Sequence, residues 1–161
     1  MTFLWTRSTL FSEDWDLITW WLESFSSHFA ILVGSTIYHW SFSGFKADTM
    51  DDFTKNRMIV KSINYKLSPM EANRVHNRMK KRWERGSFYD YMYALWLFFM
   101  GLFLKTIRKA IPYGEPWGET ANNFICHEAI EALPKGVRPV YDRGRANTPD
   151  RLYYELLKGG A

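Results

Sequence analysis

The segment 28–42 reads HFAILVGSTIYHWSF, and its pattern decides the expected fold. Two runs rich in β-branched and aromatic residues flank a Gly-Ser pair, which predicts a β-hairpin with a two-residue turn. Such a turn pairs Ala30 with His39, and side chains alternate between the two faces of a strand. His28 and His39 should therefore project from the same face of the hairpin as diagonal neighbours.

Further elements follow on either side of the hairpin. The run 57–63 favours a third strand. Ser68, Pro69 and Glu71 mark a helix start, because serine can cap it, proline suits its first position and glutamate completes a capping box. Gly86 is the expected end of that helix. Its predicted apolar stripe comprises Ala72, Val75, Met79 and Trp83. Other helices are expected at 11–25, at 89–109, from Cys126 onward and from 148–150 onward.

The opposite face of the helix that begins after Ser68 is strongly basic. It carries Arg74, Arg78, Lys80, Lys81 and Arg85. A row of charges on one helix face is typical of a solvated surface, so we expect no nucleic-acid partner. The net charge of +4 permits contact with anionic partners without requiring it.

The overall composition indicates one α+β domain. The chain has 161 residues, of which 47% are hydrophobic and 18% are aromatic. We expect a Trp-rich segment at 1–26 and a compact core at 27–157. The N-terminus lacks the features of a signal peptide, and the longest apolar run, 92–104, is too short for a membrane span. We expect synthesis in the cytoplasm and no transmembrane segment.

The single cysteine is the strongest candidate for chemistry. Cys126 follows a loop rich in glycine and asparagine at an expected helix start, where the helix dipole favours a thiolate. A histidine close in space would favour it further, and the base itself needs a third polar group to orient it. We therefore expect His28 to pair with Cys126 and His39 to orient His28. Neither a metal nor a cofactor is expected, because no His-x-x-x-His or Cys-x-x-Cys spacing occurs.

Five segments in order resemble a known family, the circularly permuted, NlpC-like branch of the papain-like cysteine peptidases of bacteria and phages. They are 27–31 (SHFAI), 38–39 (YH), 86–91 (GSFYDY), 123–128 (NFICHE) and 148–152 (TPDRL). They resemble, in turn, the strand that begins with the catalytic histidine, the third polar residue, the Gly-x-x-Tyr-Asp segment, the nucleophile box and the Thr-Pro-x-x-Leu element. His127 departs from the family, which usually has serine there.

The resemblance implies a papain-like fold in which a small antiparallel sheet packs against the cysteine helix and additional helices. It also implies hydrolysis of amide bonds, with bacterial cell-wall peptide as the expected substrate. Tyr89 and His127 are the residues expected to contact the substrate.

Two other functions remain open from the sequence alone. The chain could be a structural or interaction protein of a larger assembly such as a phage virion, docked through its Trp-rich N-terminal segment. It could also be a lipid or thioester acyl hydrolase, or an acyltransferase.

Overall fold

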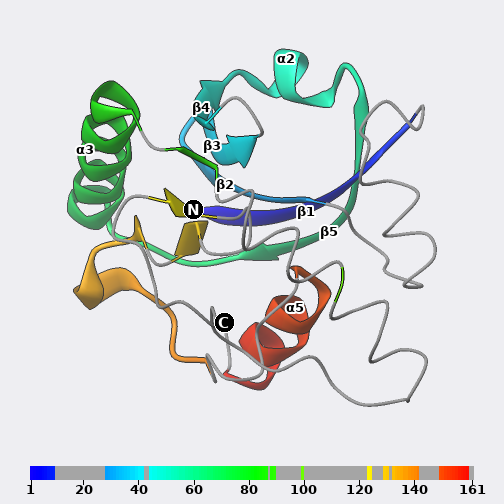
Figure 1. Ribbon diagram of the computed structural model, residues 1–161. Coiled ribbons are helices and arrows are strands. Elements are labelled where there is room, and N and C mark those ends of the chain that lie inside the picture. Colours follow the sequence, from blue (N-terminus) through cyan, green and yellow to red (C-terminus); the bar gives the residue numbers. More distant parts are fainter. Residues whose placement is uncertain are drawn as a thin grey trace.

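A five-stranded antiparallel sheet with helices on both faces forms the centre of the computed structural model (Figure 1). The structure describes residues 1–9, 28–41, 44–86, 88–89, 99, 123–124, 129–130, 132–141 and 149–159. The order of the strands across the sheet is β4-β3-β2-β1-β5. They are β1 (Thr2–Ser8), β2 (His28–Val33), β3 (Thr36–Ser41), β4 (Gly44–Asp48) and β5 (Arg57–Asn64).

The smaller elements surround this sheet. They are α2 (Met50–Thr54), α3 (Pro69–Arg85), β6 (Phe88–Tyr89), β7 (Asn123–Phe124), the 3-10 turn η2 (Lys135–Val137) and α5 (Pro149–Lys158). This arrangement confirms a mixed α+β fold. Among the described residues, no helix combines the length and the apolar character needed to cross a membrane.

The predicted hairpin is confirmed together with its register. β2 and β3 pair antiparallel from Val33 opposite Thr36 to Ala30 opposite His39. Gly34 in the turn has a φ of 62°, a left-handed conformation that glycine adopts without steric cost. The two-residue turn therefore fixes which side chains of the two strands share a face.

Two strands of the five-stranded sheet, β1 and β4, were not expected from the sequence. β1 lies between β2 and β5 and pairs with both, so the predicted strand at 57–63 adds to β1 rather than to the hairpin (Figure 1). Residues 3–6 of β1 are all buried, because both faces of this central strand are covered. A strand buried on both faces lacks the alternation of polar and apolar residues that makes a strand visible in a sequence.

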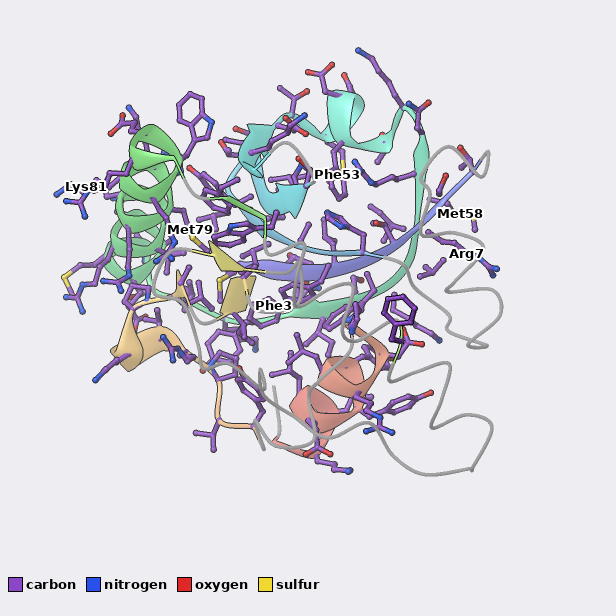
Figure 2. All side chains as sticks on the ribbon, in the orientation of Figure 1. Phe3, Arg7, Phe53, Met58, Met79 and Lys81 are labelled. Atoms are coloured by element: carbon purple, nitrogen blue, oxygen red, sulfur yellow. The ribbon has the colours of Figure 1, made fainter. Side chains whose placement is uncertain are left out.

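The two faces of the sheet carry different parts of the core. On one face, Phe3, Trp5 and Phe29 pack with α3, with residues 129–130 and 132–133, and with α5. On the other face, a smaller cluster joins Leu4, Ala30, Ile37 and Phe53 of α2. Figure 2 shows Phe3 and Phe53 on opposite sides of the sheet. The positions of the histidines in the alternation place them on the face of the smaller cluster.

Helix α3 begins as the sequence predicts. Ser68 Oγ accepts a hydrogen bond from the backbone N–H of Glu71, and a Glu71 carboxylate oxygen accepts one from the backbone N–H of Ser68. Val75 and Met79 are fully buried as expected. The placement of Trp83 in the apolar stripe is wrong, since its side chain is 47% exposed. It lies one turn beyond Met79, in the last turn of the helix.

The remaining helices expected from the sequence have different outcomes. The helix expected at 11–25 and the helix start at Cys126 lie outside the described residues. Of the helix expected at 89–109, the structure describes only Tyr89 and Phe99, and Phe99 is helical. Tyr89 ends the short strand β6 rather than opening a helix, because its backbone pairs in parallel with Phe124 of β7. The last expected helix is confirmed as α5, and Leu152 and Leu156 bury it against the sheet.

Candidate functional site

The two histidines of the hairpin meet as the sequence predicts. His28 is the first residue of β2 and His39 lies in the middle of β3. His28 Nε2 lies 2.9 Å from His39 Nδ1, and the rings meet edge to face with centroids 5.0 Å apart. The diagonal neighbours of the hairpin are therefore joined by a hydrogen bond.

Asp48 extends this pair, and the sequence did not reveal it. Its Oδ2 lies 2.9 Å from His39 Nε2. Asp48 ends β4 opposite Ile37, which makes it a diagonal neighbour of His39 across the β3–β4 pair. His28, His39 and Asp48 thus form a hydrogen-bonded row across three adjacent strands, which we call the His-His-Asp relay.

The carboxylate fixes the direction of every hydrogen bond in the relay. The hydrogen bond from His39 holds the pKa of Asp48 below its usual value, so Asp48 is ionised and accepts from His39 Nε2–H. A neutral His39 then has its lone pair on Nδ1 and accepts from His28 Nε2–H. The remaining nitrogen of His28, Nδ1, has no hydrogen-bond partner among the described residues. It carries the lone pair of a base.

Burial keeps both histidines neutral. His28 and His39 are 6% and 1% exposed, and the ring of Phe53 covers them at centroid distances of 6.2 and 5.0 Å. Desolvation lowers the pKa of His28 well below its usual value, and the neighbouring His39 and Arg57 lower it further. Desolvation also lowers the pKa of His39, although the hydrogen bond to Asp48 opposes this effect. His28 is therefore unprotonated at neutral pH, as a general base must be.

These two lowered pKa values predict a fold that weakens in mild acid. Unfolded histidines bind protons below about pH 6.5, whereas the folded state excludes them. The stability that comes from burying neutral rings is complete above that pH and is lost as the pH falls below it. Each histidine contributes a slope of up to about 1.4 kcal/mol per pH unit. Urea titrations at about pH 7.5 and about pH 5.5 measure this slope. A slope as steep in His28→Gln as in the unmodified chain would contradict the account.

The other predicted site residues are placed only in part. Cys126 and His127 lie outside the described residues, and only the backbone of Tyr89 is described. β6, which contains Tyr89, lies beside β7, which ends two residues before Cys126 in the sequence. β6 also contacts β4, the strand that carries Asp48. Downstream of Cys126, Ala129 and Leu133 pack on the face of the sheet opposite to the relay.

The relay is not arranged like a metal site. Its three side chains bond to one another in a row and do not converge on one point. Three of the four histidine nitrogens, His28 Nε2 and both nitrogens of His39, form the hydrogen bonds of this row. Within the described part of the chain, no group of three or more His, Cys, Asp or Glu residues could hold a metal ion. The arrangement is suited to moving a proton at His28 Nδ1.

The chain was compared with known proteins at three levels. No protein-family model, no curated protein and no solved structure matches it. The likeness to permuted NlpC-like hydrolases therefore stays a prediction that rests on the five sequence segments, while the relay rests on the geometry of β2, β3 and β4.

Proposed function

We propose that the chain is a cysteine hydrolase in which His28 is the general base for the thiol of Cys126. The observation that carries this proposal is the His-His-Asp relay, in which the lone pair of His28 Nδ1 is the one basic position that no described residue occupies. Hydrolases activate a nucleophile with a base that a further polar group holds in orientation. Here His28 would be the base, His39 would orient it, and Asp48 would orient His39.

The proposed reaction is acyl transfer through a thioester. The thiol of Cys126 gives its proton to His28 Nδ1 as its sulfur attacks the carbonyl carbon of an amide. The backbone N–H of Cys126 stabilises the oxyanion. The imidazolium of His28 then gives its proton to the leaving amine, and afterwards takes a proton from the water that hydrolyses the thioester. Asp48 offsets the positive charge through His39.

The proposed fold is the papain-like, permuted NlpC type, and two features support it. The histidine strand comes first and the cysteine segment last, and β6, which contains Tyr89, pairs with β7, which ends two residues before Cys126. Cys126 stands three residues before Ala129, a chain length of about 10 Å when extended. Because His28 is the first residue of β2, Cys126 would reach it around the end of that strand. Tyr89 and His127 would then contact the substrate.

Bacterial cell-wall peptide is the proposed substrate, and it can be tested directly. Purified peptidoglycan is incubated with the protein, and the soluble products are analysed by mass spectrometry. We expect peptide fragments with new amino and carboxyl ends from the unmodified chain and none from Cys126→Ala. The same products from both proteins would refute the role of Cys126. No products from either protein would refute the substrate.

A further inference from the structure

A groove runs along α3 on the face of the sheet opposite to the relay. It has a volume of about 760 Å³ and lies between the helix and the turn at Pro134. Its lining comprises Met70, Asn73, Arg74, Asn77, Arg78, Lys81, Arg82, Arg85, Gly86 and Pro134. Half of these residues are cationic, and among the described residues no carboxylate and no aromatic ring lines the groove.

The acidic side chains of α3 are used elsewhere. Glu71 accepts hydrogen bonds from Ser68 in the capping box. A carboxylate oxygen of Glu84, Oε1, lies 4.0 Å from Nζ of Lys80, and Lys80 is outside the groove. The hydrogen bonds from Ser68 lower the pKa of Glu71, and the nearby charge of Arg74 lowers it further, but no ion pair within the described part of the chain neutralises Arg74 or Arg85.

Two arginines in the groove are held in place by the protein. Arg78 Nε donates a hydrogen bond to the carbonyl oxygen of Ala132 at 2.8 Å. The guanidinium of Arg82 lies 5.6 Å from the ring centroid of Trp40, in cation–π contact. Partial burial and the nearby charge of Arg78 lower the pKa of Arg82. Like charges held this close repel one another, and a bound anion would relieve the repulsion.

We propose that this groove binds a linear phosphodiester polymer through the phosphates of its backbone. Arg74, Arg78, Lys81 and Arg85 follow one another at intervals of three or four residues, so they form a row along one side of α3. The row is about 16 Å long at 1.5 Å per residue. A row of that length matches successive phosphates of a chain better than a single phosphate, and arginine pairs with phosphate in a bidentate manner.

The groove should recognise the backbone of such a polymer and not its bases. Proteins that bind single-stranded nucleic acids stack the bases on aromatic side chains, and no aromatic ring is part of the described lining. A base-free poly(glycerol phosphate) and an oligothymidylate with the same number of phosphates should therefore bind with similar affinity, which revises the expectation that this basic helix face has no nucleic-acid partner. This inference does not depend on the proposed hydrolase, because the relay lies on the other face of the sheet.

Fluorescence anisotropy with both labelled polymers tests the proposal over a range of salt concentrations. Log K should fall with log salt by about 0.7 for each phosphate contact. Replacing Arg74, Lys81 and Arg85 together by glutamine should weaken binding by about 10- to 100-fold and reduce the salt slope by about 2. Circular dichroism then checks that the variant is folded.

A matched control removes three charges outside the groove. Glutamine replaces the exposed Lys55, Lys66 and Lys80, so both variants fall from a net charge of +4 by the same three units. The control should bind within about twofold of the unmodified chain. Equal weakening of both variants would mean attraction by net charge alone and would overturn the proposal. So would the failure of both polymers to bind at low salt, or a strong preference for the oligothymidylate.

Discussion

Replacing Asp48 with asparagine should lower turnover by about 10⁴-fold, the loss expected when the histidine of a catalytic triad is held in the wrong tautomer. The side-chain amide of asparagine can donate to His39 Nε2, whereas the carboxylate of Asp48 can only accept. His39 would then have its proton on Nδ1 and donate to His28 Nε2. That exchange moves the proton of His28 to Nδ1 and removes the lone pair that the reaction needs.

Nitrogen NMR of the histidine rings separates this effect from a general loss of structure. We expect a protonated Nε2 on both rings in the unmodified chain and a protonated Nδ1 on both in Asp48→Asn. The control is Asp51→Asn, which removes the same charge from an exposed residue of α2 that makes no bond to the relay. Its activity should be unchanged. Full activity in Asp48→Asn would exclude Asp48 from the site.

The largest loss of stability is expected from replacing Trp5 with alanine. Trp5 is fully buried in β1 and contacts the rings of Phe29 and Tyr153, each at a centroid distance of 5.1 Å. Its Nε1–H also donates a hydrogen bond to the carbonyl oxygen of Pro149 at 2.6 Å, which ties the sheet to the start of α5. Removing a buried tryptophan costs about 3–5 kcal/mol.

Urea denaturation measures this cost, and two further variants explain its origin. Trp5→Phe keeps most of the apolar area but removes the hydrogen bond to the Pro149 carbonyl, so a smaller loss of about 1–3 kcal/mol is expected from the lost bond and the smaller ring. Trp83→Ala truncates a tryptophan that is 47% exposed, and the change should stay within about 0.5 kcal/mol. Similar losses for Trp5→Ala and Trp83→Ala would contradict the core described here.

The parts of the fold that local sequence determines were predictable. The hairpin follows from a Gly-Ser pair between two β-prone runs, and α3 follows from a capping box within four residues. β1 was not predictable, because residues 3–6 are buried on both faces and lose the alternation of an ordinary strand. Trp83 continues the helical period but is 47% exposed, in the last turn of α3. Periodicity therefore predicts which face of a helix is apolar, but not how many turns of that face are buried.

The candidate site was also predictable only where local sequence determines it. His28 and His39 share a face because the register of one hairpin places them there. Asp48 joins them only through the pairing of β4 with β3, and its strand gives a weak signal in the sequence: Gly44–Asp48 is five residues long, with two charges. A strand expected after the hairpin would have placed an acidic side chain beside His39.

The burial of the relay itself points to a function. Two neutral imidazoles and a carboxylate in a low-dielectric site lower stability in mild acid, as the pKa shifts indicate. Apolar side chains would fill the same space beneath Phe53 without that cost. The proposed proton transfer gives a reason for a polar row that ends in a basic nitrogen with no partner among the described residues.

The most direct test of the central claim is the rate at which iodoacetamide alkylates the thiol, measured against pH. The chain has one cysteine, so every alkylated molecule reports on Cys126. If His28 takes the proton of the thiol, the charge of the thiolate opposes the desolvation that lowers the pKa of His28 in the neutral pair. Alkylation should then stay fast well below pH 8 and should slow to the profile of an ordinary thiol, with a pKa of about 8.5, in His28→Ala. An ordinary profile in the unmodified chain, unchanged by His28→Ala, would contradict the pairing of Cys126 with the relay.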